Sequence, residues 1–196
     1  MPGSRGRSRP TWRASVPDQL PAANTTCCGV TVSPFTLTET VALSAGKLAS
    51  SQAAISILRE RLDDTERGSI FTVDNMFEAA RQVGEALREV YRRDAEALKD
   101  HNVEFNAQLI FGGQIAGELP RLFCVYAPGN FIEATADTPY FQIGESKYGK
   151  PIIDRVVTRS TSLAQAAKCA LISMDSAIRS KQSVGLPLEL LTIQRD

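Results

Sequence analysis

Histidine, tryptophan and cysteine are scarce in this 196-residue chain. It holds one His, one Trp and four Cys. A single imidazole leaves a histidine-based catalytic triad with only one possible base. The cysteines, Cys27, Cys28, Cys124 and Cys169, contain no C-x-x-C pair, so they do not supply the usual zinc ligand sets, and they are too few for a disulfide scaffold. We therefore expect a reducing, cytoplasmic compartment and no metal or organic cofactor.

An excess of charge of one sign is also absent. Lys and Arg number 22, Asp and Glu number 22, and the formal net charge is +0. A chain without a positive excess is a poor candidate for a dedicated nucleic-acid binder. No apolar run approaches the roughly 20 residues that a membrane-spanning helix requires. We therefore expect neither nucleic acid nor a membrane as a partner.

The charge that is present is unevenly distributed. Residues 1–37 hold four Arg against one acid, a local balance of 4 − 1 = +3, so residues 38–196 carry −3. This first segment is rich in Pro, Ser and Thr and shows neither strand nor helix periodicity, so it has little apolar surface to offset the entropy of ordering it. We predict that residues 1–36 form a disordered or non-native leader and that 37–196 form the folded domain.

The remainder of the chain, 43% hydrophobic and 22% charged over the whole sequence, has the composition of a globular domain. Two consecutive helices on each side of antiparallel strands favour an α+β fold over a parallel, alternating one. Glycines and one polar pattern set the boundaries: Gly112-Gly113 predicts a turn, Gly144 the start of a helix, and Ser162-x-x-Gln165 a capping box. The predicted elements are a strand 38–45 ending at Gly46, helices 47–64 and 73–98, strands 105–111, 122–126 and 131–134, helices 144–155 and 163–178, and a strand 188–193.

Local motifs give little support to conventional chemistry. Gly112 to Gly117 has the outer spacing of a phosphate-binding loop, but Glu118 stands where that loop needs a lysine. His101 lies in a polar run typical of a solvated loop, and the carboxylates are scattered. The run Gly144 to Lys150 is the best candidate: a helix opened by glycine would expose backbone N–H groups to a carboxylate or an oxyanion. The alternative is a simple strand-to-helix corner.

Four stretches together resemble the proteasome β-subunit superfamily and, more narrowly, the bacterial family called Anbu, for ancestral β subunit. They follow the family's order over about residues 37–196. The stretches are Leu43 to Ala49, Phe105 to Gln114, Gly129 to Ala134 continuing through Gly144 to Pro151, and Ser183 to Leu188.

The resemblance implies a four-layer αββα sandwich and an N-terminal-nucleophile hydrolase. In such an enzyme an N-terminal Thr attacks a carbonyl and its own α-amine acts as the base. Gly46 matches the position whose backbone N–H stabilises the oxyanion. The resemblance also implies a homo-oligomeric ring or helical assembly through helix pairs, with residues 47–64 and 74–98 as the interface.

The start of the chain departs from this pattern. No Thr, Asp or Lys of residues 1–36 matches the catalytic set of the family, so the nucleophile is unknown. Thr25 and Thr26 would be exposed only by an internal cleavage, and their surroundings do not resemble the family's start. We therefore expect the fold to lack its first β-hairpin, which would leave one sheet edge open and one apolar face partly uncovered.

Three functions remain open at this point. The first is a threonine-type peptidase subunit that acts on peptides or proteins and is inactive in this version. The second is a non-catalytic structural subunit of a proteasome-like assembly. The third, which the resemblance disfavours, is a small ligand-binding α+β domain.

Overall fold

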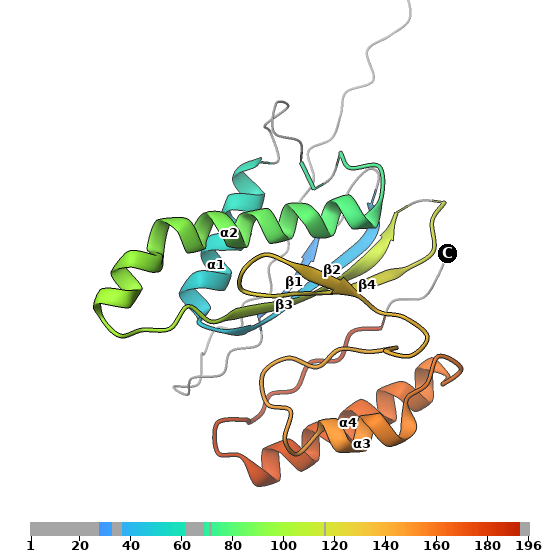
Figure 1. The fold of residues 1–196 in the computed structure, drawn as a ribbon. Helices are drawn as coiled ribbons and strands as arrows, with labels where there is room; N and C mark the ends of the chain where they lie inside the picture. Colours follow the sequence, from blue (N-terminus) through green and yellow to red (C-terminus); the bar gives the residue numbers. More distant parts are fainter. Residues whose placement is uncertain (1–27, 33–36, 62–68, 71, 116, 193–196) are drawn as a thin grey trace, which may run out of the picture.

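The computed structural model describes residues 28–32, 37–61, 69–70, 72–115 and 117–192. The elements follow the α+β order of strands, a helix pair, strands and a second helix pair (Figure 1). They are β1 Cys28–Val32, β2 Leu37–Gly46, α1 Leu48–Glu60, α2 Met76–Asp100, β3 Ala107–Ile115, β4 Arg121–Val125, β5 Phe131–Glu133, α3 Lys150–Val156 and α4 Leu163–Ser180.

The strands form one antiparallel sheet in the order β1-β2-β3-β4-β5. The β2–β3 ladder runs from Leu37 opposite Ile115 to Gly46 opposite Ala107. The predicted strand ending at Gly46 is confirmed, as are the predicted strands 122–126 and 131–134, which pair with one another as β4 and β5. β1 lies inside the segment predicted as a leader, so the sheet begins before residue 37. The sequence did not predict β1, because a run of five residues interrupted by Gly29 gives little periodicity. The rest of that leader, 1–27 and 33–36, lies outside the described residues.

The predicted turn at Gly112-Gly113 is wrong, because both residues lie inside β3. A Cβ atom at Gly112 would lie 2.8 Å from Leu122 Cδ1 on the neighbouring strand. The glycine therefore makes room for a cross-strand side chain, which is a requirement of packing rather than of chain reversal.

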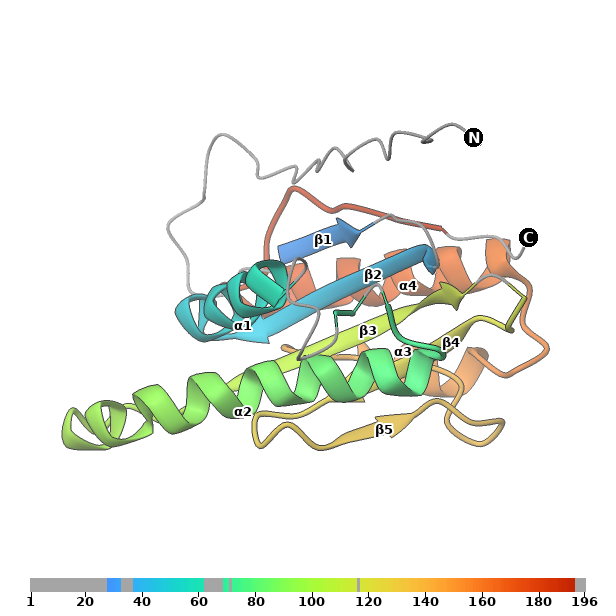
Figure 2. The same cartoon turned by 90° about the horizontal axis from the view of Figure 1, so that it is seen from above.

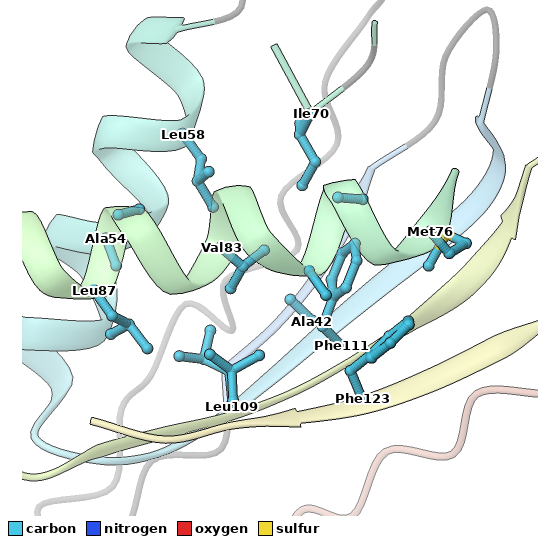
Figure 3. Packing of buried hydrophobic residues seen from close by; sticks show 14 of the residues in the cluster. Ala42, Ala54, Leu58, Ile70, Met76, Val83, Leu87, Leu109, Phe111 and Phe123 are labelled. Carbon is cyan, nitrogen blue, oxygen red and sulfur yellow. The ribbon is translucent and has the colours of Figure 1, made fainter. Parts of the chain in front are cut away.

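Helices α1 and α2 cover one face of the sheet and enclose the core (Figure 3). Fully buried side chains from α2 meet those of the middle strands, and each such large apolar group contributes about 1.5–3 kcal/mol. The largest of them are Phe123, Met76, Leu87, Leu109, Val83, Val90 and Val125.

The long helix α2 extends past the end of the sheet (Figure 2). Its N-cap is Asn75, whose side chain accepts the Glu78 N–H at 2.9 Å. In its middle, Gly84 approaches the β4–β5 turn so closely that a Cβ atom there would lie 2.2 Å from the Gly129 carbonyl oxygen. Arg88 Nη2 donates to the same carbonyl at 2.8 Å. This contact fixes the helix against the hairpin.

Helices α3 and α4 lie on the other side of the sheet (Figure 1). They pack on each other, and within the described residues no Cα atom of either comes within 8 Å of a strand. The loop 134–149 and the segment after α4 run between them and the sheet. The second sheet of the four-layer arrangement is not seen among the described residues and stays a prediction, as does the missing first hairpin.

Helix α4 starts as predicted, with Ser162 and Gln165 forming a complete capping box. The larger apolar side chains of α4 are not the ones that it buries. The side chains buried in the structure are Cys169, Ser173 and Ala177, while Leu163 and Leu171 are 47% and 43% exposed. The small residues face α3 and Gly149, where a Cβ would lie 2.4 Å from Ser173 Oγ. Ile172 is exposed as well, whereas Ala167, Ala170, Met174 and Ile178 are half-buried.

Two other boundaries need correction. The helix predicted for 144–155 begins only at Lys150, because Pro151 has no N–H to donate and is tolerated only in the first turn. The strand predicted for 188–193 is not formed over 188–192, where no other described strand pairs with it and Leu190 and Leu191 are both exposed. Ile193 lies outside the described residues.

The described helices include none that is long and apolar enough to cross a membrane. Among the described residues no group of three or more His, Cys, Asp or Glu is placed to hold a metal ion. Cys124 and Cys169 are free, buried thiols.

Replacing Gly84 with Ala should destabilise the fold by about 1–3 kcal/mol, because the new Cβ meets backbone that has no room to move. Urea unfolding followed by circular dichroism measures the loss. Gly185→Ala is the control, since a Cβ there meets nothing within 4 Å. Equal stability of the two variants would contradict the close approach.

The pair Arg121–Glu133 should make stability depend on acid pH. Arg121 donates twice to the Glu133 carboxylate at 2.6 Å, which lowers the pKa of Glu133. Its contribution is present above the ordinary glutamate pKa and is lost as the pH falls through the lowered value. Since both side chains are partly exposed, we expect less than about 1 kcal/mol. Urea unfolding at about pH 7 and pH 3 should show a smaller acid loss in Glu133→Gln than in the unmodified chain, and no such change in Asp137→Asn.

Candidate functional site

Gly46 forms a corner between the end of β2 and the start of α1. Its φ of +104° lies in the region that favours glycine. A Cβ atom at Gly46 would lie 2.4 Å from the carbonyl oxygen of Asn106, which is too close for any side chain. The same carbonyl accepts the Lys47 N–H at 2.8 Å. The backbone of Asn106 thus fixes the peptide that follows Gly46.

The first turn of α1 continues this corner. Lys47 is the N-cap and makes no side-chain capping bond, and the first turn contains no acidic residue. The Ser51 hydroxyl donates to the Lys47 carbonyl at 3.3 Å. A strand-to-helix corner of this kind places backbone donors at one point of the surface, which is the arrangement that stabilises developing negative charge. The assignment of Gly46 as the oxyanion donor stays a prediction.

The segment that begins at Gly144, a second candidate from the sequence analysis, lies against the same end of β2. The Cβ position of Gly144 is 3.5 Å from the Cβ of Ala45, the residue before Gly46, although nearly one hundred residues separate the two in the chain. Gly144 has a φ of +78°. It turns the chain ahead of a loop, not ahead of a helix, so the interpretation as a glycine-opened helix start is wrong.

The loop after Gly144 is held by its own polar contacts. Glu145 accepts the Lys147 N–H at 2.7 Å, and its carboxylate lies 3.7 Å from Lys181 Nζ. The Gln142 amide donates to the Glu145 carbonyl at 2.6 Å. The loop is therefore ordered by two hydrogen bonds between its own groups and by an ion pair with Lys181 at the end of α4.

The following helix is tied to the same segment by a three-residue network. Lys150 donates to the Asp154 carboxylate at 2.7 and 2.8 Å and to the Tyr140 hydroxyl at 3.2 Å, and Tyr140 donates to Asp154. The bond from Lys150 lowers the pKa of Asp154 and raises that of Lys150, while burial raises the pKa of Tyr140. The hydrogen bonds of Tyr140 and Asp154 connect the segment before α3 to the first turns of that helix.

The remaining candidates of the sequence do not gather at this corner. His101 is an exposed C-cap residue of α2. Gly112 to Ile115 are β-strand, so they do not form a phosphate loop. Thr25 and Thr26 lie outside the described residues. A groove of about 670 Å³ lies at the far end of α2, lined by Tyr91, Ala95, Glu96, Leu98, Lys99, Asn102, Val103, Glu104 and Phe105; it includes neither Gly46 nor Gly144.

Asn106 is the residue at the corner whose role the sequence left unassigned. The stretch Phe105 to Gln114 pointed to a strand and to the family, but nothing in it showed that the Asn106 carbonyl would lie against Gly46. A tight strand-to-helix turn after a glycine requires a backbone acceptor for the next N–H. This requirement is the one feature of the sequence that could have predicted such a contact.

Solved structures similar to this chain decide the family. The helical assembly of the Anbu complex from Pseudomonas aeruginosa is 42% identical, with a TM-score of 0.80 over 89% of this chain and 76% of that chain. Anbu from Hyphomicrobium sp. strain MC1 is 46% identical, with a TM-score of 0.72 over 90% of this chain and 71% of that one. The chain belongs to the Anbu family.

A third Anbu structure, from Yersinia bercovieri, is 56% identical, with a TM-score of 0.69 over 76% of this chain. The chain spans 61% of the length of that protein. No protein-family model and no curated protein matches the chain. The resemblance drawn from the four sequence stretches is thereby confirmed.

Replacing Gly46 with Ala should destabilise the chain by more than replacing Gly117 with Ala. Both glycines have positive φ, +104° and +86°, which costs an L-residue about 1–2 kcal/mol. Only Gly46 adds a clash, since a Cβ at Gly117 meets nothing within 4 Å. Urea unfolding of the two variants measures the difference. Gly46→Ala no more costly than Gly117→Ala would show that the Asn106 contact is absent.

Proposed function

We propose that this Anbu-family chain is a subunit of a homo-oligomeric, proteasome-like assembly built around a peptidase-type site at the β2–α1 corner. The observation that carries the proposal is Gly46. It has a backbone conformation and a closeness to Asn106 that only glycine satisfies, at the position where the family resemblance puts the oxyanion donor. Gly144, which opens a segment that also carries the resemblance, contacts Ala45, the residue before Gly46.

The four-layer αββα sandwich is part of this proposal. The second face of the sheet carries Leu43 and Ile132, which are 39% and 45% exposed, and three large apolar residues of α4 are exposed as well: Leu163, Leu171 and Ile172. Helices α3 and α4 make no close approach to a strand among the described residues. A second apolar sheet between these two surfaces would bury both, as the four-layer arrangement requires.

Catalysis at this corner would use the Gly46 N–H to stabilise an oxyanion, with substrate peptide bound between the β2–α1 corner and the Gly144 loop. We assign no nucleophile within residues 28–192, because none of them matches the catalytic Thr of the family. We therefore propose that the 196-residue polypeptide does not cleave peptides, and that it acts in a cytoplasmic compartment without a metal or organic cofactor.

A non-catalytic structural role is the second candidate. It is favoured by the closed core that the helix pair α1–α2 forms with the sheet, in a chain for which no nucleophile is assigned. The relative from Pseudomonas aeruginosa is described as a helical assembly. We propose that this chain assembles through residues 47–64 and 74–98, where Phe77 and Tyr91 are about half exposed on α2.

Assembly is tested by sedimentation velocity at micromolar concentration. We expect a complex larger than a monomer, which Phe77→Glu should dissociate because it puts a charge into an apolar contact. Leu119→Glu is the matched control, since Leu119 is exposed on the β3–β4 turn outside the helix pair. A monomeric chain, or equal dissociation by the two substitutions, would refute assembly through this pair.

Catalysis is tested on the same preparations with a fluorogenic peptide library. We expect no turnover above buffer. Hydrolysis that a threonine-directed covalent inhibitor abolishes would overturn the proposed inactivity and would favour the peptidase over the structural role. Assembly without turnover favours the structural role.

A further inference from the structure

Two lysines without an acidic partner flank the candidate site. Lys47 directly follows Gly46, and Lys147 lies three residues after Gly144, which contacts Ala45. Within the described residues neither ammonium group pairs with a carboxylate; the Lys147 ammonium lies 5.4 Å from the centre of the Tyr148 ring. The two positive charges are therefore available to a ligand.

Two acidic groups near Lys147 in the sequence, Glu145 and Asp154, are already engaged. The Glu145 carboxylate holds the Lys147 N–H and lies near Lys181, and Asp154 is paired with Lys150. Glu104, two residues before Asn106, lines the separate groove at the end of α2 together with Lys99. The chain as a whole has a net charge of +0, so the positive charge at the corner is a local feature.

Lys47 is also an unusual residue for its place. An N-cap favours Ser, Thr, Asp or Asn, and a cation at the positive end of a helix is unfavourable. At α1 the N-cap is Lys, it makes no capping bond, and no acid in the first turn offsets it. A local choice that lowers helix stability next to a candidate site is typical of a residue kept for binding.

We propose that the site selects peptides with Asp or Glu side chains close to the bond held at Gly46, and that Lys47 and Lys147 recognise those carboxylates. The proposal rests on the proposed function, because it takes the β2–α1 corner as the place where the peptide lies. Lys47 is bonded directly to Gly46, and the loop that carries Lys147 contacts the same strand end through Gly144 and Ala45. Recognition by exposed ammonium groups acts mainly through long-range attraction and weakens with salt.

The test measures binding, so it needs no turnover. A fluorescein-labelled octapeptide with two Asp and two Glu is compared, by anisotropy on the intact chain, with the same peptide carrying Asn and Gln. At low salt the acidic peptide should bind about tenfold more tightly, in line with two solvent-exposed charge pairs. The double variant Lys47→Gln with Lys147→Gln should abolish the preference, and Lys99→Gln with Lys168→Gln, which removes the same charge elsewhere, should leave it.

Each outcome decides the proposal. Equal binding of the two peptides, no binding of either, or the same loss in the control variant would overturn it; Lys147→Gln alone gives the answer if the Lys47 variant fails to fold. A lysine-dependent preference without assembly or turnover would support the binding site while refuting the proposed function. Assembly without a preference for the acidic peptide would support the proposed function while refuting the binding site.

Discussion

The close approach of the Asn106 backbone to Gly46 is the constraint on which the site depends. It closes the end of the β2–β3 ladder, orients the peptide that enters α1, and permits only glycine at that point. The loop that begins at Gly144 then lies against the preceding residue, Ala45. The corner and the helix start are therefore fixed by one backbone contact, between Gly46 at the end of β2 and the residue that precedes β3.

The two sides of the sheet are stabilised in different ways. Toward α1 and α2 the side chains are buried in a continuous core that includes Leu109 and Phe123. Toward α3 and α4 the contacts are made by loops, and large apolar side chains such as Leu43 stay partly exposed. The first side accounts for the stability of the described fold, and the second side is where a further layer would add most.

Sequence patterns predicted the elements whose signals are local. The capping box at Ser162 and Gln165 located the start of α4, and the strand ending at Gly46 was found from its β-branched residues. The wrong turn at Gly112 and the wrong helix start at Gly144 arose because each glycine contacts a residue that is distant in the sequence. Gly112 makes room for Leu122, and Gly144 lies against Ala45. No local pattern reports such a contact. The candidate site was found at Gly46 by family resemblance alone, and the role of the Asn106 carbonyl required coordinates.

Gly84 and Gly129 constrain one another. A Cβ on either would lie 2.2 Å from the carbonyl oxygen of the other, so each clash is with main chain and no change at the second position relieves it. The two positions therefore cannot drift independently in evolution, nor can a paired exchange restore the fit. In related proteins that keep this helix-on-hairpin contact, both should remain glycine, and loss of one should coincide with a shifted helix axis or an altered turn length.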